Sequence, residues 1–301
     1  MQTDEITISS EEMCVRLDKF LAQAYPLHSR TYFQYLIDRG LVLVNGDVWK
    51  KKDIPRLGDT VEVCFELTPE LNLTPENIPL DILYEDEFLL AVNKPPGMVV
   101  HPAPGHPQGT FVNALLYHCQ SLPDMESLRP GIVHRLDKDT SGVLLAAKTL
   151  ASHQQLIDLF ASRQMEKTYQ AICVGTPRDG VIDAPIGRHP TRRQEMAVRE
   201  GGKVALSDVK CLKTRGDLSF VEIRPKTGRT HQIRVHLAHI AAPVLGDPVY
   251  GRPAMNEKWD VQQQLLHASQ LRFTHPMTGK FLEIIAPLHG RFTKFLEYLD
   301  Q

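Results

Sequence analysis

Hydrophobic positions in the first 65 residues follow a helical period and then a hairpin pattern. Ser9 and Glu12 form a capping-box pair, and apolar residues recur behind it at helical spacing, which predicts a helix from about Ser10 to Ala24. Ser29 can cap a second helix, and Gly40 stands where a left-handed C-terminal cap is expected. The pattern therefore predicts two consecutive helices.

A β-hairpin is predicted directly after the second helix. The apolar run Leu41–Val44 is followed by Asn45 and Gly46 and then by a second short stretch with β propensity. The pair Asn-Gly favours a type I′ turn, because that turn needs a positive φ at both central residues. Two helices and a hairpin together predict a small compact domain over residues 1–65.

The rest of the chain divides into a linker and a larger domain. Residues 66–80 contain three prolines among polar residues and show no sustained period, which predicts a linker. From residue 81 to residue 301, short β-like runs intermix with helical stretches, so we expect an α+β domain with a mixed, mainly antiparallel sheet. The predicted strands are 88–92, 143–147, 169–174 and 220–223, and the predicted helices are 112–118, 153–162 and 231–240.

Composition narrows the class of protein. The chain has 301 residues, 42% of them hydrophobic, which is typical of a globular protein with a sizeable core. Its apolar stretches, such as Gly142–Ala147, are far shorter than the roughly 20 residues of a membrane span. Residues 1–10 lack Lys, Arg and an apolar segment, so no secretory signal is expected. Five widely spaced cysteines without a C-x-x-C pair favour a cytoplasmic protein.

The net charge of −2 conceals an uneven distribution. Residues 161–240 hold 15 Lys+Arg and 8 Asp+Glu, a difference of +7, whereas residues 1–70 hold 8 and 12, a difference of −4. The basic middle segment keeps a nucleic-acid partner open. In the acidic N-terminal domain, the basic side chains either gather on one surface that contacts phosphates or form an ordinary solvated face. They include Arg16, Arg30, Lys50 and Lys51.

A dense polar segment, Gly131–Gly142, precedes the apolar run Val143–Ala147. A loop that leads into a buried strand is a natural place for a reactive group on a rigid support. Asp137 has Arg135 and Lys138 beside it, and their charges would stabilise its carboxylate if they are close in space. The alternative for a single Asp in a loop is a turn or cap residue.

A second cluster of basic residues lies between Lys226 and Leu237. Gly228 permits a tight turn before the predicted helix, whose first amides would suit a phosphate. Arg229 and Arg234 supply fork-like donors for phosphate or carboxylate. Three histidines follow, but neither an H-E-x-x-H pattern nor a companion cysteine accompanies them, so no metal site is expected.

Short motifs recur along the predicted helices and hairpin of the N-terminal domain. They are RLDKFL at 16–21, SR at 29–30, LI at 36–37, Gly40, VNG at 44–46 and LGD at 57–59. With these motifs, the N-terminal domain resembles an S4 RNA-binding domain over about residues 14–63. The resemblance implies that this domain binds RNA, with Arg16, Arg30, Lys50 and Lys51 as contacts.

Further motifs are distributed over the rest of the chain. They are NKPPG at 93–97, HRLDKDTSG at 134–142, KTY at 167–169, PIGRHPT at 185–191, GRTHQIR at 228–234, GDPVYG at 246–251 and LHA at 266–268. With these motifs, nearly the whole chain resembles the RluA family of pseudouridine synthases, and most of all its RluD-type ribosomal RNA enzymes. The motifs are long and occur in family order, which argues against chance agreement.

This resemblance implies the isomerisation of uridine to pseudouridine in RNA, without a cofactor or a metal. Asp137 matches the essential aspartate of the family, which acts either as a nucleophile on the sugar or as a base at C2′. Arg234 matches the arginine that pairs with and orients that aspartate. Tyr169 matches the tyrosine that stacks on the target base, and the alternative for it is a core aromatic residue.

The resemblance also implies which residues contact RNA. A uridine must leave the base stack to react, and Arg135 matches the residue that fills the vacated space. His134 is expected in the same RNA-binding loop, while Arg188 and Arg229 are expected to contact backbone phosphates, with solvent-facing charge as the alternative for each.

Large-subunit (23S) ribosomal RNA, free or in an assembling subunit, is the expected substrate, and the protein is expected to be a monomer without membrane contact. Two alternatives remain: the same reaction on transfer RNA or another structured RNA, and an inactive RNA-binding factor of ribosome assembly. The sequence does not identify the modified uridines.

Overall fold

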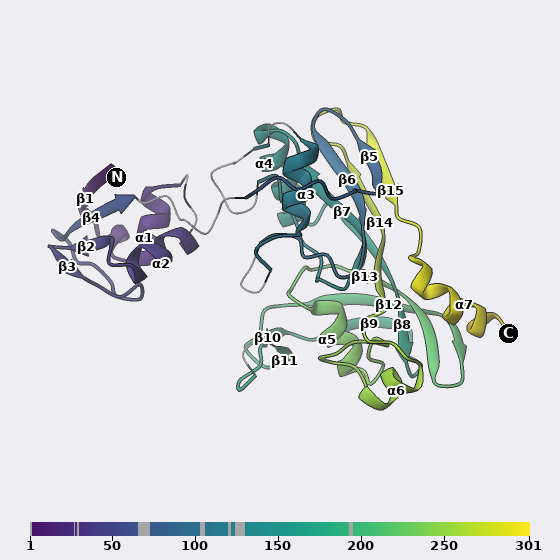
Figure 1. Cartoon of the computed structure of the whole chain (residues 1–301). Helices are drawn as coiled ribbons and strands as arrows, with labels where there is room; N and C mark the ends of the chain where they lie inside the picture. The colour runs from purple at the N-terminus through teal and green to yellow at the C-terminus, as the bar shows by residue number, and fades with distance from the viewer. Residues whose placement is uncertain are drawn as a thin grey trace. The chain divides into compact units, whose positions relative to one another are not determined.

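The computed structural model describes residues 2–26, 28, 30–65, 73–102, 106–119, 122–123, 130–192 and 195–301. The chain forms two compact units, the first within residues 1–72 and the second beginning at Leu73 (Figure 1). Each unit has a hydrophobic core of its own.

The first unit combines a four-stranded antiparallel sheet with two helices. Its strands stand in the order β1-β4-β2-β3. Apolar residues of both helices, such as Phe20 and Leu36, pack on Val61 and Val63 of the sheet in one buried core. The elements are β1 (Gln2–Thr7), α1 (Leu17–Ala24), α2 (Arg30–Asp38), β2 (Val42–Val44), β3 (Asp47–Val48) and β4 (Thr60–Phe65).

The hairpin prediction in this unit is confirmed, while the first helix starts later than predicted. Asn45 and Gly46 have φ values of 53° and 82°, as a type I′ turn requires. Instead of one helix from Ser10, a short 3-10 turn, η1 (Glu11–Met13), precedes α1.

The late start of α1 has a tertiary cause. The amides of Leu17 and Asp18 donate to the carbonyls of Asp53 and Lys51, so the chain before α1 is tied to the 50–53 segment. The second helix is found where predicted, and Gly40 behind it has a φ of 71°. Its predicted cap, Ser29, lies outside the described residues.

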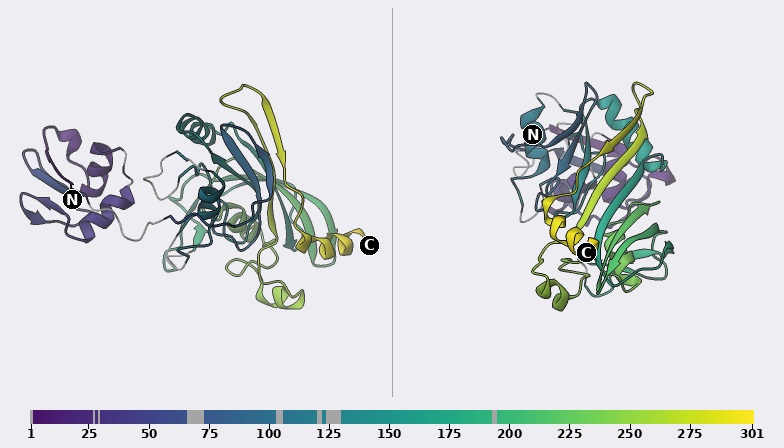
Figure 2. Two further views of the ribbon diagram at one scale, coloured as in Figure 1. Left: turned by 45° about the horizontal axis from the view of Figure 1, so that its top comes forward. Right: turned by 90° about the vertical axis from the view of Figure 1, so that its right-hand side faces the viewer.

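The second unit is built on a nine-stranded sheet, mainly antiparallel as predicted. Its order is β5-β6-β7-β14-β8-β13-β12-β9, with β15 paired to β14, and among the described strands only the β7–β14 pair is parallel. Figure 2 shows the two units from two further directions. The strands are β5 (Ile82–Glu85), β6 (Leu89–Lys94), β7 (Ser141–Ala147), β8 (Glu166–Val174), β9 (Gly180–Asp183), β12 (Leu206–Arg215), β13 (Leu218–Pro225), β14 (Leu266–Thr274) and β15 (Phe281–Ile285).

Helices cover both faces of this sheet. The helices α3 (Phe111–His118) and α5 (Gln232–His239) pack on one face, and α4 (Leu150–Ala161) and α7 (Thr293–Asp300) pack on the other. The period of two along β8 produces this division, because alternate β8 side chains belong to the α5 core and to the α7 core. Tyr169 contacts both cores on the α3–α5 face.

The second unit also contains smaller elements outside the nine-stranded sheet. A separate antiparallel hairpin, β10 (Ile186–Arg188) and β11 (Met196–Val198), packs against α5. The remaining elements are α6 (Pro253–Lys258) and the 3-10 turn η3 (Gly290–Phe292).

The second half of the predicted linker belongs to the second unit. Residues 66–72 lie outside the described residues, but Leu73 and Leu80 pack on the α3 core. The side-chain amide of Asn113 donates to the Thr74 carbonyl at 2.9 Å, and the Glu76 carboxylate accepts the Gly109 amide at 3.0 Å. The second unit therefore begins at Leu73, earlier than the proline content of residues 66–80 predicts. Among the described residues, no helix is long and apolar enough to cross a membrane.

Candidate active site

One row of residues across the central strands carries the site. Gly142 of β7, Ala268 of β14, Tyr169 of β8 and Ile223 of β13 lie in register side by side. Gly142 has a φ of 108°, and a Cβ there would lie 2.2 Å from the Ala268 carbonyl oxygen. Only glycine therefore allows β14 to approach β7 this closely.

The loop that holds Asp137 enters β7 just before this row, and distant segments fix it. Gln264 donates to the hydroxyl of Thr140 at 2.8 Å, and Arg291 donates to the carbonyl of Asp139 at 2.8 Å. These contacts come from residues more than 120 positions along the chain. These contacts attach the loop to segments outside β7.

Lys94 also supports the Asp137 loop. Its ammonium group is fully buried and donates to the carbonyls of Pro95, Met98 and Lys138 at 2.9, 3.0 and 2.9 Å. Burial lowers the pKa of Lys94 to about 7. Three carbonyl acceptors compensate the loss of water, so Lys94 joins the 94–98 turn to the Asp137 loop.

Arg234, on α5, connects two carboxylates. Its Nη1 donates to Oδ2 of Asp137 at 2.9 Å, while Nε and Nη2 donate to Asp247 at 2.7 and 2.9 Å. The arginine and Asp247 are almost inaccessible, whereas 22% of the Asp137 side chain is exposed. Burial acts to lower the pKa of Arg234, but the hydrogen bonds and charges of the two carboxylates outweigh it and raise the pKa.

The carboxylate of Asp247 accepts four hydrogen bonds. Its Oδ1 accepts the backbone amides of Val249 and Tyr250 at 2.8 and 3.0 Å, in addition to the two bonds from the guanidinium of Arg234. The preceding Gly246 has a φ of 79°, and a Cβ there would lie 2.2 Å from the Gln263 carbonyl oxygen. This turn places a fixed anion behind the arginine that faces Asp137.

His231 and Tyr250 approach Asp137 from another direction. Nδ1 of His231 lies 2.9 Å from the Tyr250 hydroxyl, which also accepts the Met196 amide at 2.9 Å. Nε2 of His231 lies 4.0 Å from Oδ1 of Asp137. The Tyr250 ring lies below Arg234, with the guanidinium carbon 5.0 Å from the ring centre.

Tyr169 lies on β8, near the Asp137 loop, and is half-buried. Burial, and after it the charge of Asp137, raises the pKa of Tyr169, so the phenol keeps its proton at neutral pH. The phenol forms no hydrogen bond with the described residues, and its ring packs between the two cores. Core packing and base stacking are both compatible with this position.

A cavity of about 900 Å³ opens onto Asp137, Arg234 and His231. Because its walls carry both signs of charge, it suits a polar ligand with phosphates nearby. Tyr169 is not part of the wall. The cationic wall residues are Arg135, Lys138, Arg192 and Arg234, and the acidic ones are Asp137, Asp139 and Glu195.

His134, expected in the RNA-binding loop, forms contacts within the protein. Its Nε2 accepts the Leu145 amide at 2.8 Å, and its ring stacks on Phe160 at 4.6 Å. Burial lowers the pKa of His134 to about 3, so the ring is neutral and serves as an acceptor. His134 therefore anchors the Asp137 loop to β7.

The arginines expected to contact RNA in this unit lie in three environments. Arg135 is exposed and lines the Asp137 cavity. Arg188 is exposed at the end of β10. Arg229 is half-buried, and its Nε donates to the Val204 carbonyl at 3.0 Å, so part of its donor set is already used.

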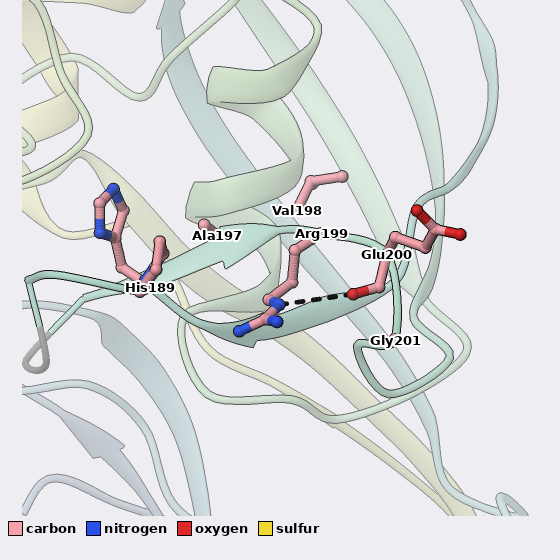
Figure 3. Close-up of a pocket in the computed structure, with 7 residues that line it drawn as sticks. His189, Ala197, Val198, Arg199, Glu200 and Gly201 are labelled. Carbon is pink, nitrogen blue, oxygen red and sulfur yellow. Dashed lines mark hydrogen bonds between the residues drawn. The ribbon is translucent and has the colours of Figure 1, made fainter.

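The β10–β11 hairpin forms a second, open cavity of about 730 Å³. Figure 3 shows His189, Arg199 and Glu200 around it, with Arg199 donating to the Glu200 carbonyl. This cavity lacks a carboxylate paired to an arginine side chain. The Asp137 cavity is therefore the better candidate for chemistry.

In the first unit, two of the four expected RNA contacts share one buried acid. Asp18 is inaccessible and accepts hydrogen bonds from Arg16, Arg30 and Gln34 at 2.6 to 3.1 Å. Both arginine side chains are 47% exposed. Burial alone would raise the pKa of Asp18, but these hydrogen bonds lower it. The cluster leaves one positive charge in excess on the surface.

The two lysines of this unit are also accessible. Lys50 is exposed, and Lys51 forms a 2.8 Å ion pair with Asp38. Exposed pairs of this kind contribute little to stability and open easily toward a phosphate. Among the described residues, no group of three His, Cys, Asp or Glu side chains is arranged to hold a metal ion.

The sequence did not predict Asp247, Tyr250 and His231 as parts of the site. All three stand in motifs that were recognised, but no role was assigned to them. Two signals were available: an acid that directly follows a glycine in a polar turn, and a histidine three residues before the arginine of the site.

Comparisons with known proteins agree with this geometry. Residues 88–239 match the RNA pseudouridylate synthase family, and residues 15–61 match the S4 domain. Ribosomal large subunit pseudouridine synthase D of Pasteurella multocida is 41% identical, over 98% of this chain and 95% of the relative. An uncharacterized RNA pseudouridine synthase of Bacillus subtilis is 43% identical, over 99% of both chains.

A solved structure with a similar fold is human RNA pseudouridylate synthase domain containing 4. It is 27% identical with a TM-score of 0.58, and the match covers 73% of this chain and 92% of the human one. The matched families, the relatives over nearly the full length and the fold lead to one conclusion: the chain belongs to the RNA pseudouridylate synthase family and carries an S4 domain.

Proposed function

We propose that the protein converts specific uridines of large-subunit ribosomal RNA into pseudouridine, with Asp137 as its catalytic residue. The Asp137–Arg234 pair carries this proposal: a loop carboxylate with one oxygen bound to a buried arginine and the other facing a cavity. The names of several relatives, ribosomal large subunit pseudouridine synthase D, support the choice of RNA. We infer a cytoplasmic location from that substrate.

The reaction needs a carboxylate and a closed site. The base leaves C1′ of the ribose, rotates while bound, and reattaches through C5. Whether Asp137 attacks the sugar or removes the C2′ proton, it must use an oxygen that Arg234 does not occupy, and Oδ1 is that oxygen. Arg234 holds the carboxylate oriented throughout.

Tyr169 and Arg135 complete the proposed mechanism. The protonated phenol of Tyr169 lies beside the Asp137 loop, where a base that leaves the stack could pack on its ring. Extraction of that base costs a few kcal/mol, which contacts elsewhere must supply. Arg135 at the cavity wall, and Arg16 and Arg30 on the S4 domain, are the proposed contacts.

Replacement of Asp137 by Asn tests the proposal. Transcripts of 23S and 16S ribosomal RNA and a transfer RNA pool are incubated with each protein, and pseudouridines are mapped by carbodiimide labelling and primer extension. We expect wild-type signal at defined sites in the 23S transcript alone, and a loss of more than about 10³-fold with Asp137→Asn.

Asp158→Asn is the matched control, because Asp158 lies on α4, on the opposite face of the sheet. It should leave the 23S signal unchanged. Full activity of Asp137→Asn would overturn the mechanism, and modification of the transfer RNA pool alone would overturn the substrate.

A further inference from the structure

We propose that His231 and Asp137 together bind the 2′-hydroxyl of the target nucleotide, with Nε2–H of His231 as donor and Oδ1 of Asp137 as acceptor. The inference rests on the proposed function, because it needs a nucleotide sugar at Asp137. It assigns His231 to the substrate site and gives the enzyme a means to select ribose.

The spacing of the two side chains is the first support. Nε2 of His231 and Oδ1 of Asp137 are 4.0 Å apart, which is too far for a direct hydrogen bond. One oxygen atom about 2.8 Å from each spans that gap, with its two hydrogen bonds near a right angle. Both side chains are 22% exposed and line the same cavity, so a ligand atom can reach the gap.

The proton on His231 is the second support. The Tyr250 hydroxyl accepts the Met196 amide, so its own proton is available to Nδ1 of His231 at 2.9 Å. Burial lowers the pKa of His231, so the ring is neutral and carries a single proton. With Nδ1 as acceptor, that proton is on Nε2, which faces Asp137.

The acceptor side of the gap is equally well defined. Arg234 occupies Oδ2 of Asp137, and Oδ1 accepts no hydrogen bond from the described residues. The gap thus presents one donor and one acceptor. A hydroxyl group, which donates one hydrogen bond and accepts another, matches this pair, whereas a phosphate oxygen lacks the proton that a carboxylate requires.

The chemistry of RNA then identifies the hydroxyl. Within an RNA strand the 3′ and 5′ oxygens are esterified, so the 2′-hydroxyl is the free hydroxyl of each ribose. It is also the group by which a protein distinguishes RNA from DNA. Reaction at C1′ or C2′ brings the sugar to Asp137, and the 2′-hydroxyl comes with it.

The backbone conformation of His231 also indicates that the surrounding residues fix the position of its side chain. Its φ is 55°, in the left-handed region, directly before α5. A non-glycine residue keeps this conformation only where the surroundings enforce it, and such positions gather at functional sites. The hydrogen bond with Tyr250 and the edge-on contact of the two rings, 5.7 Å apart, enforce it here.

The test compares ribose with deoxyribose at the target position. Two synthetic RNA hairpins contain the uridine mapped in the 23S experiment, one with uridine and one with 2′-deoxyuridine at that position. We measure kcat/KM on both with the wild type, His231→Gln and His231→Met. Gln and Met have similar size and the same backbone strain, but only Gln carries an N–H donor.

We expect the wild type to prefer the ribose hairpin by about 10- to 100-fold, as for one hydrogen bond to a charged group. His231→Met should reduce that preference at least fivefold by slowing the ribose reaction, whereas His231→Gln should stay within about threefold of the wild-type preference. Thermal unfolding midpoints and RNA affinities of both variants check folding and binding.

Two results would overturn the inference: a wild type without preference for ribose, or a His231→Met variant that slows both hairpins by the same factor. The second result would make His231 a structural residue. A wild type that forms no pseudouridine in the 23S transcript would overturn the proposed function itself, and this inference with it.

Discussion

The two units contain charge clusters of opposite design. In the S4 domain, one buried carboxylate, Asp18, holds two arginines that are half exposed. In the synthase domain, one buried arginine, Arg234, holds two carboxylates, of which Asp247 is buried and Asp137 faces a cavity. In both clusters the central charged side chain is buried, and at least one partner of opposite charge stays accessible.

The difference shows how one type of ion pair serves two purposes. The S4 cluster has a surplus cation at the surface, which suits phosphates. The synthase cluster has a surplus carboxylate in a cavity, which suits chemistry at a sugar. The buried ion positions its partners in both cases, so its loss should affect binding in one domain and turnover in the other.

Among the changes that test this comparison of the two clusters, Asp247→Asn is expected to have the largest effect. The side-chain NH₂ of an Asn at this position would face either the Arg234 guanidinium or the Val249 and Tyr250 amides, so donors would face donors. The guanidinium is buried and cannot bind water instead. We expect a loss of about 3 kcal/mol in stability and about 10²-fold in kcat, with KM changed less. Urea unfolding and single-turnover kinetics measure the two. Unchanged kcat in a folded variant would mean that Arg234 needs no second carboxylate.

Asp18→Asn should have a smaller and different effect. Arg16 and Arg30 can turn to water once their shared acceptor is weakened, so the expected loss of stability is about 1 to 2 kcal/mol. The RNA affinity should fall about 3- to 10-fold while kcat at saturating RNA stays constant, as filter binding and steady-state kinetics would show. A fall in kcat alone would contradict this division between the domains.

The smallest expected effect is a difference between the two domains in how their stability depends on pH. The pKa of His134 is about 3 in the folded protein against 6.5 unfolded, so its contribution to stability is complete above pH 6.5 and is lost as the pH falls toward 3. That amounts to about 1 kcal/mol by pH 5.5. Asp18, with a lowered pKa, loses its contribution only below pH 3.8.

Each domain has one tryptophan, Trp49 or Trp259, so single-tryptophan variants of the full chain can follow the two transitions separately. Between pH 7 and 5.5 the Trp259 signal should shift to lower urea, and the Trp49 signal should not. His134→Gln keeps an acceptor for the Leu145 amide without a titrating group, and should reduce the pH dependence. The remaining dependence comes from histidines such as His267, whose pKa burial lowers to about 4. Equal shifts of both signals would contradict the assignment.

The sequence predicts most clearly those elements whose apolar pattern is continuous. The buried run of β7 and the core-facing residues of β8 and β13 were found because their side chains are apolar throughout. The strand β14 was missed because it buries His267 and Ser269. Its polar groups are satisfied by partners such as Ser141 and the Ala286 carbonyl, which no local pattern indicates.

The same limit applies to the site. Family motifs identified Asp137 and Arg234, which the structure joins at 2.9 Å. The sequence did not indicate the partner of His134, because the amide of Leu145 on β7 reaches its ring only in the folded structure. Asp247 has no sequence neighbour that reveals its arginine, because the pair forms only when α5 meets the following turn.

The parallel pairing of β7 with β14 has a consequence for the time at which the enzyme forms. Ser141 and His267 are 126 positions apart, and the contact between Asp139 and Arg291 spans 152 positions. Closure of such long loops is slow, and a chain under synthesis lacks these partners until His267 and then Arg291 have been added. The nascent protein thus carries Asp137 in a loop without these contacts, and the loop acquires its full set of supports only near chain completion.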